Sequence, residues 1–319
     1  MPAVPAARPS GPVLLVHAGA WDMPEEEREP HRRACAAALA VGWAALRGGA
    51  PAVEAVARAI EVLEDDPAVN AGTGSVLTRE GWVELDAGLM DGRTQQVGAV
   101  IGLRTARHPI AVARSLLGAE HVLLSGAAAE QAVRAGGHAT QPPEAFVTQR
   151  ERARLAAWRA DAARRQPGGS FGPAPSPAAA AAAAARPADT VGALALDLRG
   201  QLAAGLSTGG ACGKPSGRVG DAPIPACGYW ADGEAAAACT GWGESILRVA
   251  LARRAAELAT AAGAEAGARA AIDELGQRVG GLGGLILLRR DGSLACAFNT
   301  PRMARGWMHA GLAAPCVEA

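Results

Sequence analysis

Thr190 is the residue whose type and place in the chain most directly suggest chemistry. It follows Asp189 and opens the run Val191-Gly192-Ala193, which has the small, apolar character of a core strand. A threonine hydroxyl is a poor nucleophile at neutral pH and needs a base within hydrogen-bond reach. If the chain is cut before Thr190, the new α-amine, with a pKa of about 8, supplies that base from the same residue.

This hypothesis requires self-cleavage, because the uncut chain has only an amide nitrogen at Thr190. The hydroxyl can make the cut itself: Thr190 Oγ would attack the carbonyl carbon of Asp189 and form an ester that water hydrolyses. The plainer interpretation is that a β-branched residue simply opens a strand. The dipeptide alone favours the plainer interpretation, so the surrounding sequence has to decide.

The sequence differs sharply on the two sides of Thr190. Residues from about 166 to 189, here called the tether, are rich in Gly, Pro and Ala, and no helix or strand is expected there. After Thr190, apolar residues alternate as far as Asp197 and again from Leu202 to Leu206, across a turn at Arg199-Gly200. This pattern predicts a buried β-hairpin whose first strand begins at Thr190.

Composition limits the classes of protein. The chain has 319 residues, half of them hydrophobic, so it can bury a large core. Lys plus Arg and Asp plus Glu both number 31, which argues against a nucleic-acid or membrane-surface partner. The six cysteines lack C-x-x-C spacing, the first dozen residues lack a signal peptide's apolar core, and the alanine run is too short for a membrane span. We therefore expect a cytoplasmic protein with reduced thiols.

Apolar periodicity predicts further elements. Strands are expected at Val13 to Val16, Val83 to Leu89, Val97 to Leu103, Ala235 to Thr240, Leu285 to Leu288 and Leu294 to Phe298, with a final edge strand at Met303 to Met308. Helices are expected at His31 to Arg47, Pro51 to Leu63, Pro109 to Leu117, Ala127 to Ala135, Glu151 to Arg164, Ser245 to Ala261 and Ala264 to Val279. Strands in two blocks with helices outside them suggest two stacked sheets between helical layers.

Several collinear motifs make the Thr190 hypothesis specific. The chain resembles the N-terminal-nucleophile hydrolases of the plant-type L-asparaginase and isoaspartyl peptidase family. The resemblance covers nearly the whole chain except the tether and the N-terminus. Its motifs are His17-Ala18-Gly19-Ala20, Asn70-Ala71-Gly72-Thr73-Gly74, Glu84-Leu85-Asp86-Ala87, Met90-Asp91-Gly92, Asp189-Thr190-Val191-Gly192, Leu206-Ser207-Thr208-Gly209-Gly210, Gly217-Arg218-Val219-Gly220-Asp221, Cys239-Thr240-Gly241-Trp242-Gly243-Glu244 and Phe298-Asn299-Thr300.

The resemblance implies a fold and an assembly. The fold class would be α+β, a four-layer αββα sandwich forming one structural domain. Self-cleavage before Thr190 would give an α subunit of residues 1–189 and a β subunit of residues 190–319. Two such pairs would associate as (αβ)2.

The resemblance also implies roles for individual residues. Thr190 would be the nucleophile and Thr208 the hydroxyl that polarises it, since the two lie on the arms of one hairpin. The Thr240 hydroxyl and the Gly241 N–H would form the oxyanion hole. Asn70 would support the nucleophile.

Two charged residues would hold the substrate. Arg218 would clamp the α-carboxylate, for which a planar fork is suited, and Asp221 would anchor the α-ammonium. Taken singly, the two residues could equally form a surface ion pair. In this family the loop before Asn70 holds a sodium ion through backbone carbonyls, which maps here to Leu63, Glu64, Asp66, Val69, Ala71 and Thr73. No cofactor is required for the chemistry.

The expected reaction is hydrolysis of an amide on the β-carboxyl of an aspartyl group. Small-molecule substrates would be L-asparagine and β-aspartyl dipeptides, which present the same free α-groups. Asp189 precedes the nucleophile where many relatives have glycine, and aspartate there is usual in glycosylasparaginases. The alternatives are therefore glycosylasparaginase-type deglycosylation and an amino-acid-binding relative that never cleaves.

Overall fold

The largest element of the structure is an eight-stranded sheet. The computed structural model describes residues 11–160 and 190–319. The strand order is β12-β11-β1-β5-β6-β2-β3-β4, and every pairing is antiparallel except that of β3 with β4. The strands are β1 (Val13–Trp21), β2 (Leu85–Asp91), β3 (Gln96–Leu103), β4 (Leu123–Ser125), β5 (Val191–Leu196), β6 (Leu202–Thr208), β11 (Arg302–His309) and β12 (Cys316–Glu318).

A second, four-stranded sheet is built entirely from residues after Thr190. Its order is β10-β9-β8-β7, and all of its pairings are antiparallel. The strands are β7 (Tyr229–Ala231), β8 (Ala235–Gly241), β9 (Gly283–Arg289) and β10 (Leu294–Phe298). Apolar side chains of both sheets meet in one buried cluster that includes Leu194, Leu206, Ile286 and Leu288. The two sheets therefore share a core.

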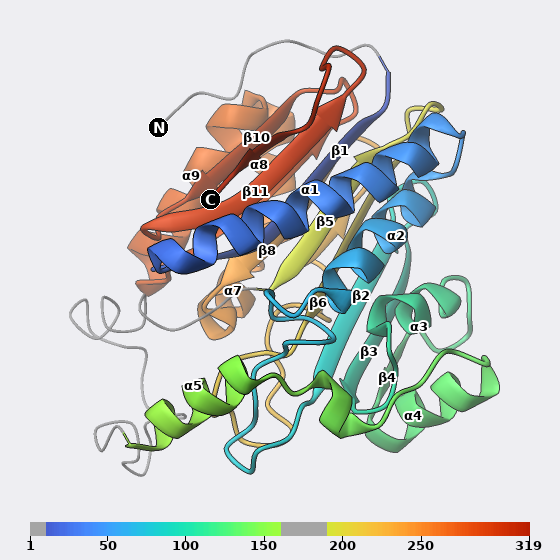
Figure 1. The fold of residues 1–319 in the computed structure, drawn as a ribbon. Coiled ribbons are helices and arrows are strands. Elements are labelled where there is room, and N and C mark those ends of the chain that lie inside the picture. The colour runs from blue at the N-terminus through green and yellow to red at the C-terminus, as the bar shows by residue number, and fades with distance from the viewer. Residues whose placement is uncertain (1–10, 161–189) are drawn as a thin grey trace.

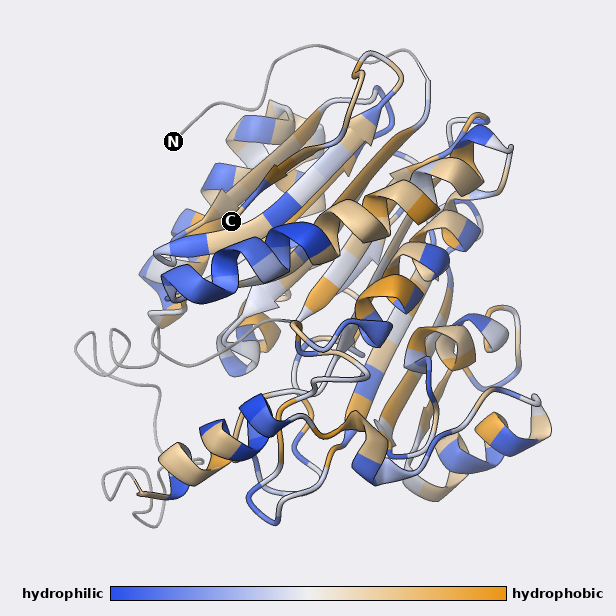
Figure 2. Cartoon of the chain, in the orientation of Figure 1, coloured by the Kyte–Doolittle hydropathy of each residue, from blue (hydrophilic) through white to orange (hydrophobic). Residues whose placement is uncertain are grey.

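Helices pack on both sheets (Figure 1). Contacts join the large sheet to α1 (Glu25–Arg47), α2 (Ala52–Asp65), α3 (Pro109–Ser115) and α4 (Gly126–Ala135), and join the small sheet to α7 (Gly243–Val249), α8 (Leu251–Ala262) and α9 (Ala264–Val279). The first half of α1 is hydrophilic and its second half is apolar (Figure 2). The short helix η1 (Pro143–Phe146) leads into α5 (Gln149–Ala160). Within the described ranges, none of the helices has the length and apolarity that crossing a membrane requires.

Most of the predicted elements are confirmed, including the hairpin of β5 and β6. The helix expected from Ser245 to Ala261 is divided, because Ala250 adopts a left-handed conformation with φ 48° between α7 and α8. The helix expected from His31 starts earlier, at Glu25. The tether and Asp189 lie outside the described residues.

The prediction that Met303 to Met308 forms an edge strand is wrong. The strand containing them, β11, lies inside the large sheet between β1 and β12. Its partner β1 comes from the other end of the chain, with Val13 opposite His309, and the last residues of the chain cover its outer side. Local periodicity finds a strand but cannot reveal partners this distant in sequence.

Candidate active site

The hydroxyls of Thr190 and Thr208 meet as the hairpin predicts. Val191 of β5 pairs with Ser207 of β6 in an antiparallel ladder. Thr190, which precedes Val191, and Thr208, which follows Ser207, are therefore neighbours as well. Thr190 Oγ1 donates to Thr208 Oγ1 at 3.0 Å, and both side chains are buried. Thr208 Oγ1 also accepts the backbone N–H of Gly210 at 3.0 Å. The position of the Thr190 hydroxyl is therefore set by a residue that is itself fixed.

Asn70 joins this group from the α2–β2 loop. Its Nδ2 donates to the carbonyl of Gly210 at 2.8 Å, and its Oδ1 accepts the N–H of Val76 at 2.9 Å. Its own carbonyl accepts the N–H of Gly209 at 3.2 Å. A Cβ on Gly209 would lie 2.6 Å from Asn70 Oδ1, so this turn requires glycine. Asn70 thus fixes the turn that carries the Gly210 N–H to Thr208.

His17 is a neighbour of Thr190 to which the sequence alone assigned no role. It lies on β1 opposite Gly192 of β5, and a Cβ on Gly192 would lie 2.3 Å from His17 Nε2. Complete burial lowers the pKa of His17 to about 3, although the Thr190 backbone opposes the shift. The ring is therefore neutral at pH 7. The sequence feature that could have indicated a role for His17 is its position at the end of the apolar run Val13 to Val16, two residues before Gly19.

The side chains of Arg218 and Asp221 lie close together, and their role as a substrate clamp stays a prediction. A Cβ on Gly243 would lie 2.9 Å from both Arg218 Nη2 and Asp221 Oδ1. Burial raises the pKa of Asp221 to about 7, while the backbone and the charge of Arg218 oppose the shift. The Arg218 guanidinium also binds Glu244, which had no predicted role: Nε and Nη2 donate to the two carboxylate oxygens of Glu244 at 2.9 and 2.8 Å.

Thr240 and Gly241 end β8 of the small sheet. Gly241 has φ 139°, a left-handed value that favours glycine, and a Cβ there would lie 2.4 Å from Gly283 Cα. The Thr240 side chain is completely buried. Gly243, where an added Cβ would lie 2.9 Å from both Arg218 and Asp221, follows two positions later. The end of β8 therefore lies near Arg218 and Asp221.

Lys214, which was not predicted, packs against the turn that follows Thr208. It is only 4% exposed, its Nζ donates to the carbonyl of Glu84 at 3.0 Å, and a Cβ on Gly210 would lie 2.9 Å from Nζ. Burial lowers the pKa of Lys214, and attraction to Asp86 opposes this. Asp86 stands directly opposite Thr208 in the β2–β6 pairing. A buried cation and a buried carboxyl thus flank the turn after Thr208.

The loop expected to hold sodium has features that fit a hard cation. A Cβ on Gly72 would lie 2.3 Å from the Glu64 carbonyl oxygen, and one on Gly74 would lie 2.6 and 2.8 Å from those of Pro67 and Val69. Glycine therefore lets the Glu64 carbonyl oxygen approach residue 72 closely, and those of Pro67 and Val69 approach residue 74. The Glu64 carbonyl already accepts the N–H of Thr73 at 2.7 Å, but a carbonyl oxygen has a second lone pair.

Acidic or soft metal ligands do not gather elsewhere. Among residues 11–160 and 190–319, no group of His, Cys, Asp or Glu side chains could hold a metal ion. The side chain of Glu64 is used structurally: its Oε1 accepts Ser207 Oγ at 2.6 Å and the Ile110 N–H at 3.0 Å. Complete burial raises the pKa of Glu64 well above its usual value.

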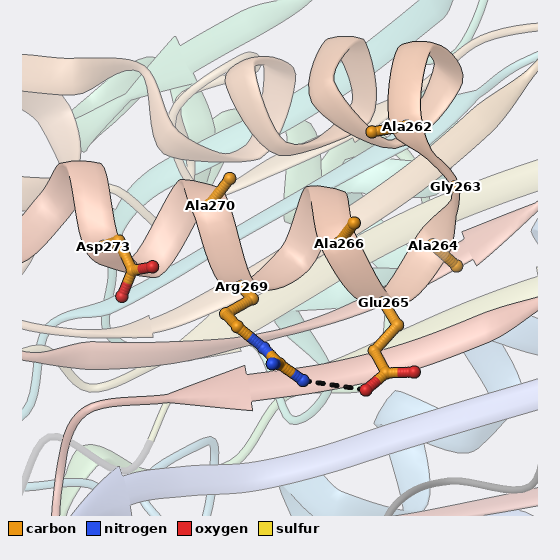
Figure 3. A pocket seen from close by; sticks show the side chains of 8 residues that line it. All are labelled: Ala262, Gly263, Ala264, Glu265, Ala266, Arg269, Ala270 and Asp273. Atoms are coloured by element: carbon orange, nitrogen blue, oxygen red, sulfur yellow. Dashed lines mark hydrogen bonds and ion pairs between the residues drawn. The ribbon is translucent and has the colours of Figure 1, made fainter.

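A pocket at the α8–α9 turn lies apart from these residues (Figure 3). Four of its eight lining residues are alanines, and an ion pair joins two others, Glu265 and Arg269, at 2.8 Å. It includes none of the predicted site residues. The candidate site is therefore the group around Thr190 and the clamp.

Comparison with known proteins agrees with the motifs. The asparaginase family model matches residues 10–316. The isoaspartyl peptidase/L-asparaginase of Bos taurus is 36% identical over 310 residues, covering 94% of this chain and 96% of the relative's chain. The isoaspartyl peptidase of Escherichia coli is 36% identical over 315 residues, covering 94% and 93%. The plant-type L-asparaginase of Pyrococcus horikoshii is 37% identical over 306 residues, covering 95% and 98%.

Proposed function

Because this chain belongs to the asparaginase family, we propose that it is a self-cleaving amidohydrolase of β-aspartyl amide bonds. Its substrates would be L-asparagine and isoaspartyl dipeptides, and each reaction would release L-aspartate. The observation that carries the proposal is the buried hydrogen bond of 3.0 Å between the hydroxyls of Thr190 and Thr208, at the first residue before β5. A threonine that becomes the N-terminal nucleophile needs a hydrogen-bond partner that holds its hydroxyl in place.

The proposed reaction has two stages. The free α-amine of Thr190 accepts the hydroxyl proton, and Oγ attacks the β-carbonyl carbon of the substrate. The Thr240 hydroxyl and the Gly241 N–H donate to the oxygen that becomes negative. The amide C–N bond then breaks, the amine leaves with a proton, and an aspartyl ester remains on Thr190. Water hydrolyses this ester to L-aspartate and restores the hydroxyl.

Recognition would depend on the α-groups of the aspartyl half. Arg218 would bind the substrate α-carboxylate. Glu244 already accepts from two donors of the Arg218 guanidinium, so the substrate carboxylate would either use the remaining donors or displace Glu244. Asp221 would bind the α-ammonium as a carboxylate. A β-aspartyl dipeptide and L-asparagine present these groups identically, so one site would serve both. The leaving group would be loosely specified.

The proposal extends to architecture and assembly. The two sheets with their helices would form the four-layer αββα sandwich of N-terminal-nucleophile hydrolases. The α subunit (1–189) and β subunit (190–319) would assemble as (αβ)2 in the cytoplasm. A structural sodium ion would bind the carbonyl oxygens of the α2–β2 loop, supported by the crowding around Gly72 and Gly74.

Self-cleavage is tested on a denaturing gel. Purified protein should separate into two chains, the shorter beginning Thr-Val-Gly-Ala, whereas Thr190→Ala should remain one chain of 32.1 kDa. A different new N-terminus, or cleavage of the variant, would refute self-processing by Thr190.

Substrate class is tested by a matched series of kcat/KM values on fully cleaved enzyme. We expect turnover of β-Asp-Leu at least as efficient as that of L-asparagine, and none of L-glutamine or α-Asp-Leu. A preference for N-acetylglucosaminyl-asparagine would assign the protein to the glycosylasparaginase type instead. A protein that stays uncut yet binds aspartate would be a non-catalytic relative.

A further inference from the structure

Helix α5 carries an arginine that binds the loop from which Asn70 reaches the site. Arg150 Nη1 donates to the carbonyl of Ala68, and Nη2 donates to the carbonyl of Gly74 at 3.2 Å. The two carbonyls lie on either side of Asn70 in the chain. In Figure 1, α5 lies beside the loop that follows α2. One planar guanidinium thus ties together the two ends of a short segment.

Acidic residues hold this guanidinium in place. Arg150 Nε donates to Glu151 Oε1 at 2.8 Å, and the Glu151 side chain is completely buried. Arg154 Nη1 binds the same oxygen at 2.7 Å, and Arg154 Nη2 binds Glu27 of α1 at 2.5 Å. Ion pairs therefore link Arg150 through α5 to the helical layer. A fork fixed in this way can resist movement of the loop.

The tied segment supports the nucleophile by a short series of contacts. Asn70 donates to the Gly210 carbonyl, the Gly210 N–H donates to Thr208, and Thr208 accepts from Thr190. A shift of the segment between Ala68 and Gly74 would move Asn70, and with it the turn behind Thr208. Reactions are sensitive to such displacements, because an error of about 1 Å in placement can cost about 100-fold in rate.

We propose that Arg150 is a positioning residue, which holds the Asn70 segment in its working shape and supplies positive charge to a loop rich in carbonyl oxygens. It touches neither substrate nor nucleophile, and its effect on turnover rests on the proposed function. Its effect on stability does not. Lysine cannot replace it fully, because a single ammonium lacks the planar fork that reaches two carbonyls.

The same geometry relates Arg150 to a cation in this loop. Ala68 and Gly74 are sequence neighbours of Val69 and Thr73, whose carbonyls are expected to bind sodium. Two positive charges near one set of carbonyls repel each other, so removing the guanidinium should strengthen sodium binding. A ligand that binds the folded state more tightly stabilises it more. Arg150→Gln, which removes the positive charge, should therefore respond more to sodium than the parent protein.

The first test measures stability in the uncleaved Thr190→Ala chain, so that every sample has the same covalent structure. Arg150→Gln, Arg150→Lys and the control Arg152→Gln are compared, since Arg152 lies exposed on the same helix. Tm is measured in sodium chloride and in choline chloride at equal ionic strength. In choline, Arg150→Gln should lower Tm by about 4 °C or more. The Tm of Arg150→Lys should lie between those of Arg150→Gln and the parent, and the Tm of Arg152→Gln should equal that of the parent.

Sodium should raise Tm more in Arg150→Gln than in the parent or in Arg152→Gln. The proposal is overturned if Arg150→Gln melts with the parent in choline, if Arg152→Gln loses as much, or if sodium raises all Tm values equally. These outcomes are informative even if the protein has no activity towards β-aspartyl substrates, so failure of the proposed function is recognised separately.

The second test measures turnover of L-asparagine by cleaved enzyme with Thr190 intact. Arg150→Gln should lower kcat about 10-fold while KM changes less than about threefold, because the clamp at Arg218 and Asp221 is untouched. Arg150→Lys should recover part of kcat. An increase in KM with unchanged kcat would show that Arg150 affects substrate binding instead, and would overturn the positioning role.

Discussion

Asp221→Asn should lower the plateau value of kcat/KM and should also reduce the slope of its acid limb when log kcat/KM is plotted against pH. In the free enzyme, burial raises the pKa of Asp221 to about 7, so the carboxylate that should receive the substrate ammonium is lost below neutral pH. The α-amine of Thr190, with a pKa of about 8, must also be unprotonated to act as base. Two groups thus have to lose protons in the free enzyme, and the acid limb of log kcat/KM should approach a slope of 2.

The variant keeps only one of these ionisations. Its acid limb should have a slope of 1, with a plateau lower by about 30-fold or more, since losing a charged partner for a buried group costs about 2–5 kcal/mol. In the parent protein, kcat should have a slope of 1 as well, because the bound ammonium stabilises the Asp221 carboxylate and removes it from the titration.

The assay is a series of kcat and KM values for L-asparagine from pH 5 to 9 at constant ionic strength, on fully cleaved enzyme. Equal limiting slopes of kcat/KM in the parent and in Asp221→Asn would refute the assignment of Asp221 to the ammonium. A plateau unchanged by the substitution would do the same.

The remaining predictions concern stability and the residues behind Thr190. Since the pKa of Asp221 is raised on folding from 3.8 to about 7, the folded state binds more protons and the free energy of unfolding falls as pH rises between those values. Asp221→Asn should therefore raise Tm at pH 8, measured by calorimetry. Thr208→Val, which keeps shape but removes the hydroxyl, should lower kcat by about 100-fold or more and slow self-cleavage on gels. Lys214→Met should destabilise the chain by about 1–3 kcal/mol in urea, because the Glu84 carbonyl loses the donor that Lys214 supplies, and Lys214→Arg should be milder.

The local parts of the site were predictable from sequence because they depend on one hairpin. Alternation placed Thr190 and Thr208 on paired strands, and the structure has their hydroxyls in contact. The closeness of Arg218 to Asp221 was also predictable, since they are three residues apart in one loop. Such contacts follow from chain geometry over a few residues.

Other parts depend on register between distant strands, and sequence could not supply it. His17 lies near Thr190 only because β1 pairs with β5 so that His17 faces Gly192. Lys214 matters only because it packs against Gly210. Glu244 belonged to a quoted motif, but its bidentate bond to Arg218 spans 26 residues. The edge-strand error for β11 has the same origin, since its partner β1 lies near the opposite end of the chain.

The order of strands explains why a cut before Thr190 need not separate the two parts of the chain. In the large sheet, β1 from the first part lies between β11 and β5 from the second part. On the other side, β6 from the second part pairs with β2 from the first. Separation would therefore break the β11–β1, β1–β5 and β6–β2 pairings together and expose the shared core of the two sheets. The ladder that holds β5 between β1 and β6 begins at Val191, so it does not require the peptide bond before Thr190. Thr190, which immediately precedes such a strand, would therefore keep its hydroxyl partner Thr208 after a cut, and the proposed cut would add only the free α-amine.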